Sequence, residues 1–239
     1  MLYLIGLGLN DENDLTLKAV EIAKKCECYC ELYTSIWHGS LENLKNMVGK
    51  EITILKRNDL EENQEMFLEK AKKNDIVLFV PGDPLNATTH INLVYEAKRR
   101  KIPVKIIHNA SIFSAISETG LQIYKFGKAA TIPLNGRLEN VKETLKNNKK
   151  LGLHTLLLLD IDNETGIRMT VHDALKLLLK SKLMKEFDNL IVLSKAGENS
   201  RIYYNTVREI LREAIDLPAV LIVPGKLHFK EKDFLELFQ

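Results

Sequence analysis

Short apolar runs alternate with longer amphipathic segments along the first half of the chain. The runs have the length of single strands and cover residues 2–6, 26–33, 52–55, 75–80 and 103–107. Between them, apolar residues recur at helical spacing, as in the segment that holds Leu60, Phe67, Leu68 and Ala71. Because parallel strands need crossovers long enough to hold a helix, this alternation predicts an α/β fold with a parallel, doubly wound sheet.

Polar residues predict where the helices of this half begin. A helix is expected over residues 15–25, and others are expected after Ser40, from Asp59, and after Thr88 or Thr89. Ser111 precedes a further apolar segment and can cap it. Each expected helix therefore lies between two expected strands.

The second half of the chain predicts a further set of strands and helices. After a loop-like region around residues 133–137, we expect a helix and then a strand at 154–159. Thr170 opens another helix in a capping-box variant, and strands at 189–194 and 219–223 flank a helix that begins near Asn205. Residues 230–238 are predicted to be helical. The two halves predict two α/β lobes, residues 1–110 and 111–239.

Charge and hydropathy exclude several classes of protein. The chain has 34 Lys and Arg against 32 Asp and Glu, a net charge of +2. Its overall electrostatic field therefore does not favour binding to nucleic acid or to an acidic membrane surface. No apolar run approaches the roughly 20 residues that cross a bilayer, and the N-terminus lacks the basic region of a secretory signal. We expect a cytoplasmic protein that binds neither membrane nor nucleic acid directly.

All three cysteines lie in one strand-like segment, at Cys26, Cys28 and Cys30. Their alternation places them on one face, where they act either as small buried apolar residues or as metal ligands. Core packing is favoured, because the six histidines show no ligand spacing and no other metal motif is present. We predict no metal.

A glycine turn, Gly6-Leu7-Gly8, follows the first strand, where a nucleotide fingerprint would lie. The dinucleotide pattern needs a third glycine where this chain has Asp11, and no phosphate-loop ending is present. An NAD-dependent dehydrogenase is therefore disfavoured. The turn is either purely structural or a loop that a ligand approaches closely.

Two further loops follow predicted parallel strands, and ligands bind at the carboxyl ends of such strands. In Pro81-Gly82-Asp83-Pro84, Asp83 either adds a charge to a ligand site or holds its own loop. In the loop that begins at His108, Ser111 serves as a helix cap, a ligand contact or both. The two loops should be neighbours at one edge of the sheet.

Six segments in order along the chain resemble the diphthine synthase family. The first two share features with the wider tetrapyrrole methylase-like superfamily, whereas Tyr124-Lys125-Phe126-Gly127 and the segment ending at His228 are specific to diphthine synthases. The segments are residues 4–9, 81–90, 108–112, 120–127, 153–160 and 223–228.

The resemblance implies a homodimer of two-lobed class III methyltransferase subunits. The N-terminal lobe would hold a mainly parallel sheet, the C-terminal lobe a mixed sheet, and S-adenosyl-L-methionine would bind in the cleft between them. The implied cofactor-binding residues are Leu9, Asp83, Asn86, Ser111, Ile112, Leu159, Ala196 and Ala219.

The implied reaction is methylation of the amino group of a 3-carboxy-3-aminopropyl histidine on translation elongation factor 2, with S-adenosyl-L-homocysteine as product. Tyr124, Lys125 and Lys128 are candidates for contacts with that protein, and otherwise form a solvated turn. No general base is identified, and desolvation of the amine can lower its pKa. The alternatives are a tetrapyrrole or ribosomal RNA methyltransferase of the same superfamily and a noncatalytic S-adenosylmethionine-binding protein.

Overall fold

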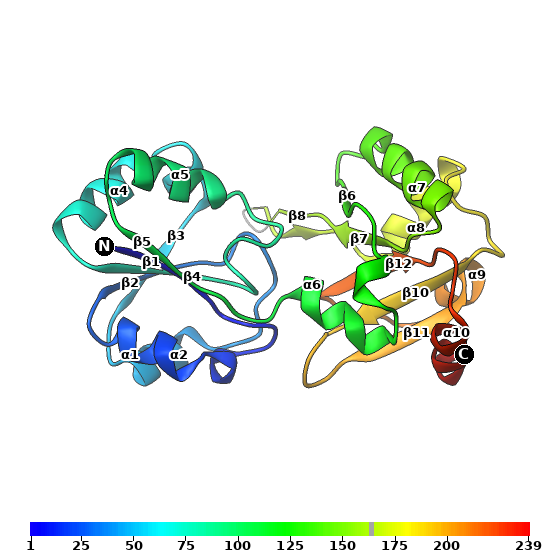
Figure 1. The fold of residues 1–239 in the computed structure, drawn as a ribbon, viewed down its shortest axis with the longest axis horizontal. Coiled ribbons are helices and arrows are strands. Elements are labelled where there is room, and N and C mark those ends of the chain that lie inside the picture. Colours follow the sequence, from blue (N-terminus) through cyan, green and yellow to red (C-terminus); the bar gives the residue numbers. More distant parts are fainter. Residues whose placement is uncertain (163–164) are drawn as a thin grey trace. The chain divides into compact units, whose positions relative to one another are not determined.

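The computed structural model describes residues 1–162 and 165–239, which form two compact units (Figure 1). The first unit comprises Met1–Phe113 and the second Ser114–Gln239. Each unit contains a five-stranded sheet with its own helices.

The first unit is built on a fully parallel sheet with strand order β3-β2-β4-β1-β5. Its strands are β1 (Leu2–Gly6), β2 (Glu27–Glu31), β3 (Ile52–Leu55), β4 (Ile76–Val80) and β5 (Val104–Ile107). Helices α1 (Leu17–Ala23) and α2 (Leu41–Val48) lie on one face of the sheet, and α4 (Gln64–Lys73) and α5 (Ile91–Arg99) lie on the other (Figure 1). This arrangement confirms the predicted α/β class, and it brings the carboxyl ends of all five strands to one edge.

Alternate residues of the central strands supply two cores, one on each face of this sheet. Leu4 and Leu78 belong to one core, and their chain neighbours Ile5 and Phe79 belong to the other. The three cysteines are buried and unpaired in the second of these cores, where they pack as apolar residues. The prediction of core packing is confirmed.

The second unit contains a mixed sheet with strand order β11-β10-β12-β7-β6. Its pairs are antiparallel except for β6 with β7, which is parallel. The strands of this sheet are β6 (Ala130–Ile132), β7 (Thr155–Leu159), β10 (Asn189–Ser194), β11 (Arg201–Thr206) and β12 (Ala219–Val223). The mixed sheet that the family resemblance implied is therefore present.

Helices and a small ribbon complete the second unit. The helices are α7 (Glu139–Leu151), α8 (Val171–Lys180), α9 (Val207–Ile210) and α10 (Phe229–Leu235), and the ribbon pairs β8 (Ile161–Asp162) with β9 (Ile167–Arg168). Shorter helices are α3 (Arg57–Glu61), α6 (Ile112–Ala115) and the 3-10 turns Glu12–Asp14, Ile116–Thr119, Ile123–Lys125 and Glu236–Phe238. Residues of α7, α8 and α9 pack with the strands into one core.

Local capping chemistry predicted some helix starts correctly and others wrongly. Ser40 and Thr170 cap α2 and α8 as expected, because each side chain accepts a backbone N–H three residues ahead. Asp59 does not open a helix; it lies inside α3, where its carboxylate accepts the N–H of Lys56 at 2.8 Å.

The predicted cap of α5 was also wrong. The helix begins after His90, because Thr88 donates its hydroxyl to the Pro84 carbonyl at 2.6 Å and Thr89 donates to Glu61 at 2.7 Å. Thr88 therefore closes the preceding loop and Thr89 ties that loop to α3, and neither side chain caps α5.

The helix expected near Asn205 is the short helix α9, which begins at Val207, but strand β11 directly before it was not predicted. The run Arg201–Thr206 is rich in β-forming residues and pairs along its whole length with β10. Thr206 then caps the short helix α9 by accepting the N–H of Glu209 at 3.3 Å. Pairing with the preceding strand β10 fixes this extended conformation.

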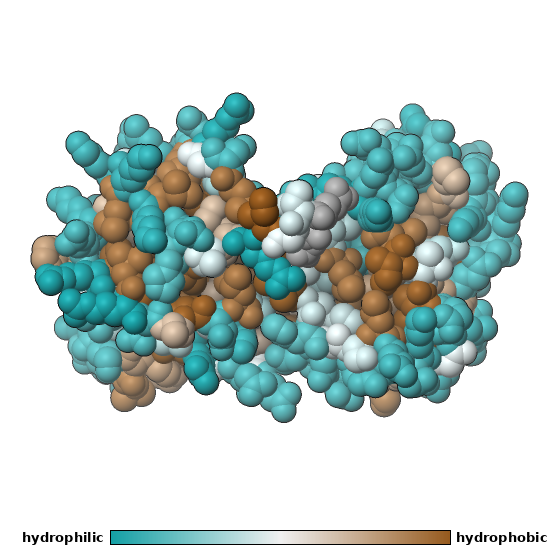
Figure 2. Space-filling view, turned by 180° about the vertical axis from the view of Figure 1, so that it is seen from behind, coloured by the Kyte–Doolittle hydropathy of each residue, from teal (hydrophilic) through white to brown (hydrophobic). Residues whose placement is uncertain are grey.

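Hydrophilic side chains cover much of the visible surface of both units, with hydrophobic side chains between them (Figure 2). Several large aromatic side chains are strongly exposed, among them Tyr124, Phe187 and Phe229. Within the described residues, no helix is both long enough and apolar enough to span a membrane.

Replacement of Phe79 by alanine tests the core beneath the first sheet. Phe79 is fully buried, so Phe79→Ala should lower the free energy of unfolding of the first unit by about 3–5 kcal/mol. Met66→Ala is the control, because Met66 is 75% exposed and its loss should change the value by less than about 0.5 kcal/mol. Urea denaturation measures both, and equal effects of the two substitutions would contradict the assigned core.

Candidate active site

Loops that follow β1 and β4 are joined at the carboxyl edge of the first sheet. Gly8 and Gly82 exchange backbone hydrogen bonds of 3.2 and 2.9 Å. A Cβ on Gly6 would lie 2.4 Å from the Gly82 carbonyl oxygen, and Gly8 has φ of +83°. Glycine is therefore required at both positions of the first turn, by close approach at one and by backbone conformation at the other.

Asp83 joins the loop after β4 to the loop after β5. Its side chain is 4% exposed, and its Oδ1 accepts the N–H of Leu85 at 3.0 Å. Its Oδ2 accepts the N–H of Asn109 at 3.2 Å and lies 2.7 Å from Nδ1 of His108. The two loops are neighbours, as predicted, and Asp83 holds them together; its contact with a cofactor stays a prediction.

Asn109 links these loops to the first turn. Its side-chain amide donates to the carbonyl oxygens of Gly6 at 3.0 Å and Asp14 at 2.9 Å. Asp14 in turn accepts the N–H groups of Leu9 and Asn10, both at 2.8 Å. The backbone of Leu9, a predicted cofactor contact, is thus held in one conformation.

Sequence reasoning missed the role of Asp14. The signal available was an acidic side chain a few residues beyond a glycine turn, since backbone N–H groups left unpaired in such a turn attract a carboxylate. That signal is weak, because an acidic residue near the start of a helix has the same appearance in sequence.

The remaining predicted contacts of the first unit also lie on these loops. Asn86 is exposed and donates its amide to the hydroxyl of buried Ser111 at 3.1 Å. Ile112, half-buried, begins α6 directly after Ser111. The structure therefore gathers the five predicted residues of this unit on three loops at one sheet edge, where polar and apolar groups are mixed.

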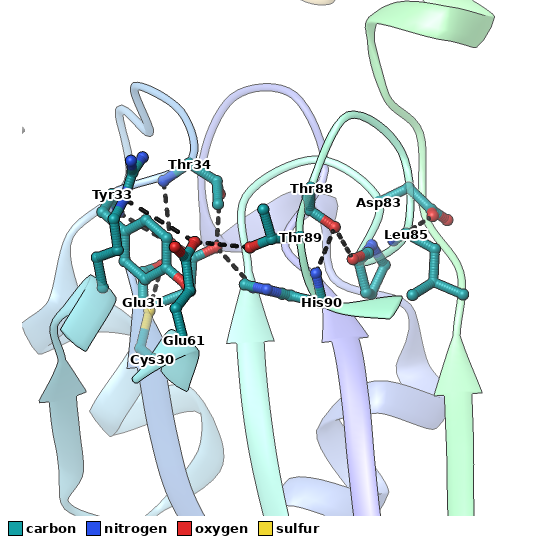
Figure 3. A network of polar contacts seen from close by, with 12 residues as sticks. Cys30, Glu31, Tyr33, Thr34, Glu61, Asp83, Leu85, Thr88, Thr89 and His90 are labelled. Carbon is teal, nitrogen blue, oxygen red and sulfur yellow. Dashed lines mark hydrogen bonds and ion pairs between the residues drawn. The ribbon is translucent and has the colours of Figure 1, made fainter. Parts of the chain in front are cut away.

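A buried polar network supports the same edge from the side of β2 (Figure 3). Glu31 is fully buried, and its carboxylate accepts the N–H groups of Tyr33 at 2.9 Å and Thr34 at 3.1 Å and the Thr34 hydroxyl at 2.5 Å. It also lies 3.2 Å from Nε2 of His90, which is 2% exposed. The network ties the end of the loop that contains Asp83 and Asn86 to the neighbouring strand.

The predicted residues of the second unit lie at strand ends. Leu159 ends β7 and Ala219 begins β12, and both pack against the core of this unit. Ala196 follows β10, next to Lys195, whose N–H donates to the Pro218 carbonyl at 2.8 Å. Ala196 and Ala219 are each 9% exposed, and their predicted role in cofactor binding stays a prediction.

The three candidate substrate contacts differ in their surroundings. Tyr124 is 80% exposed, and Lys128 is exposed with its ammonium 3.1 Å from the amide oxygen of Asn140. Lys125 instead forms an ion pair with Glu231 and donates to the Lys226 carbonyl at 2.8 Å. Lys125 therefore has a structural partner within the second unit, whereas Tyr124 is open to solvent.

Glu231 joins three of the six segments that carry the family resemblance. Its carboxylate, 1% exposed, accepts the N–H groups of Gln122 at 2.9 Å and His228 at 2.7 Å and lies 3.2 Å from Nε2 of His154. Burial alone would raise the pKa of Glu231, but hydrogen bonds from Lys125 and from these groups outweigh it and lower the pKa to about 2. Burial lowers the pKa of His154, and the nearby carboxylate opposes that shift.

Comparison with known proteins places this arrangement in a family. The sequence model described as Tetrapyrrole (Corrin/Porphyrin) Methylases matches residues 1–211. The diphthine synthase of Methanocaldococcus jannaschii is 41% identical over 252 residues, covering 99% of this chain and 98% of that protein. The diphthine synthase of Methanococcus vannielii is 39% identical, with 99% and 98% covered.

Solved structures agree with the sequence relatives. A crystal structure of diphthine synthase has a TM-score of 0.93 and 34% identity and covers 100% of this chain and 96% of its own. The structure of a putative diphthine synthase from Entamoeba histolytica has a TM-score of 0.90 and 31% identity, with 100% and 98% covered.

The chain belongs to the tetrapyrrole methylase family, and within it to the diphthine synthases. It is an S-adenosylmethionine-dependent methyltransferase of diphthamide biosynthesis.

The depressed pKa of Glu231 predicts a loss of stability in acid. The folded-state pKa of about 2 lies below the ordinary 4.5, so the contribution is complete above about pH 4.5 and disappears as the pH falls toward 2. It should amount to about 3 kcal/mol, the value of a shift of this size. Urea unfolding of the wild type and of Glu231→Gln from pH 7 to 2.5 measures it.

The difference in unfolding free energy between the two proteins should shrink as the pH falls. A difference that is independent of pH would show that the ion pair with Lys125 and the hydrogen bonds to Glu231 do not hold the carboxylate in its charged form.

Proposed function

We propose that the enzyme transfers methyl groups from S-adenosyl-L-methionine to the amino group of the 3-carboxy-3-aminopropyl histidine of elongation factor 2, forming diphthine. The observation that carries the proposal is the full-length similarity to diphthine synthases, 41% identity over 99% of the chain in one case. The family-specific segments at Tyr124–Gly127 and at the start of α10 support the same acceptor.

The loops of the first unit have the chemistry to bind S-adenosylmethionine. The ligand combines an apolar ring system with hydroxyl, ammonium and carboxylate groups, and the loops present an exposed carboxamide on Asn86, the Ser111 hydroxyl, and the apolar side chains of Leu9 and Ile112. Asp83 holds this set in place. When bound, the sulfonium of the cofactor supplies an electrophilic methyl group.

We assign cofactor binding to Leu9, Asp83, Asn86, Ser111 and Ile112 of the first unit and to the second-unit residues Leu159, Ala196 and Ala219. The task of these side chains is to orient the methyl group toward the incoming amine and to exclude water. Such positioning is worth roughly 7–11 kcal/mol of the barrier in favourable cases. S-adenosyl-L-homocysteine is the other product.

The proposal extends to assembly and location. We infer a homodimer in the cytoplasm, whose partner is elongation factor 2, with no direct binding to nucleic acid or membrane. Tyr124 and Lys128 are exposed as a docking residue requires, and Lys125 holds the turn between them.

Intact mass spectrometry tests this function. The enzyme is incubated with S-adenosylmethionine and elongation factor 2 that carries the unmethylated 3-carboxy-3-aminopropyl histidine. Stepwise gains of one methyl mass on that histidine are expected, and their number gives the count of methyl groups. Binding of S-adenosyl-L-homocysteine without any gain of mass would redirect the search to tetrapyrrole or RNA acceptors.

Tyr124→Ala tests the docking turn. Because exposed tyrosines are frequent anchors of interfaces, the substitution should raise KM for elongation factor 2 by roughly tenfold and leave the Tm unchanged. Phe187→Ala is the matched control, since Phe187 is an aromatic residue of the same unit with comparable exposure, 72% against 80% for Tyr124. An unchanged KM for Tyr124→Ala would remove this turn from the substrate contacts.

A further inference from the structure

A buried carboxylate holds an exposed imidazole at the carboxyl edge of the first sheet. Oδ2 of Asp83 lies 2.7 Å from Nδ1 of His108. The Asp83 side chain is 4% exposed and the His108 side chain is 68% exposed. The pair thus presents one histidine to solvent in an orientation set from beneath.

The hydrogen bonds of Asp83 decide which nitrogen of His108 carries the proton. Asp83 accepts N–H groups from Leu85 and Asn109, so it acts as an acceptor toward each neighbour. Nδ1 of His108 must then be the donor of the 2.7 Å bond. In the neutral ring this leaves the lone pair on Nε2, the atom that can take a proton from a substrate.

The position of the pair coincides with the proposed cofactor loops. His108 directly precedes Asn109, which anchors the first turn, and lies three residues before Ser111. Its partner Asp83 is itself one of the assigned cofactor residues. The imidazole therefore belongs to the same loop cluster that would hold the methyl donor.

We propose that His108 is the general base of the methyl transfer and that Asp83 positions it. The inference rests on the proposed function, because it requires an amine acceptor. An aliphatic amine is mostly protonated near neutral pH, and only its free base has the electron pair that attacks a methyl group. A base at the site removes this obstacle in every round of methylation.

Proton transfer to His108 comes before methyl transfer. The substrate ammonium gives one proton to Nε2 of His108, which becomes an imidazolium stabilised by the Asp83 carboxylate. The freed amine pair forms the N–C bond as the C–S bond breaks, and that electron pair stays on sulfur as a neutral thioether. The exposed imidazolium then releases its proton to water.

Other histidines of the chain are engaged differently. His90 and His154 are buried against glutamates, and His172 lies with Nε2 3.1 Å from the Leu211 carbonyl. His38 is exposed near the first turn, where its N–H donates to the Asn10 carbonyl, and within the described residues no carboxylate contacts its ring. His38 is therefore a matched control for His108.

The substitution His108→Asn distinguishes a role of His108 as general base from a purely structural role. The asparagine amide can still donate to Asp83 but cannot accept a proton, so the affinity for S-adenosyl-L-homocysteine should stay within about threefold of wild type by calorimetry. At saturating cofactor and substrate, kcat should fall by roughly a hundredfold or more. His38→Asn should keep wild-type kcat.

His108→Ala gives a second measurement that is independent of the asparagine contact. Added imidazole should restore turnover of this variant in proportion to its concentration and should not accelerate the wild type. Wild-type kcat in His108→Asn, absence of rescue in His108→Ala, or loss of turnover only in His38→Asn would each overturn the assignment. An inactive wild type would instead contradict the proposed function, so the two failures are distinguishable.

Discussion

The buried carboxylate of Asp83 is the contact on which the candidate site depends. It accepts hydrogen bonds from two backbone N–H groups and from the ring of His108, and these donors lie on two loops about 25 residues apart in sequence. Burial of a carboxylate costs free energy unless such donors surround it. Any change of loop conformation that removed these donors would therefore be strongly unfavourable. Through Asn109 the same contact extends to the first glycine turn.

In the second unit, a buried carboxylate likewise accepts hydrogen bonds from several segments. Glu231 lies at the start of α10 and gathers donors from the turn around Lys125, from His154 before β7 and from its own helix start. Glu31 in the first unit does likewise with His90 and Thr34. In each case a glutamate with almost no exposure organises irregular backbone that apolar packing alone would leave less defined.

The residues that stabilise the fold and the candidate catalytic residues lie in different parts of the structure. The apolar cores lie beside the sheets and are made by regular strands and helices. The candidate catalytic groups lie on loops beyond the strand ends, where side chains such as those of His108 and Asn86 reach solvent. Buried carboxylates connect the two, because they belong to the interior and bind the loops.

The sequence by itself determined those features that depend on neighbouring residues. The apolar runs gave the bounds of β1, β3, β10 and β12 as the structure has them, and Ser40 and Thr170 gave two helix starts. The order of six segments gave the family, and with it five candidate cofactor residues that the structure gathers at one sheet edge.

Only the tertiary structure decided the features that depend on distant residues. Strand β11, to which the sequence pattern gave no assignment, is fixed by its pairing with β10. The contact of Asp14 with the Leu9 N–H, the pair of Asp83 with His108, and the ion pair of Lys125 with Glu231, 106 positions away, leave no periodic trace in the sequence. The physical reason is that hydrophobic periodicity and capping act over a few residues, whereas a buried carboxylate takes its donors from wherever the fold brings them.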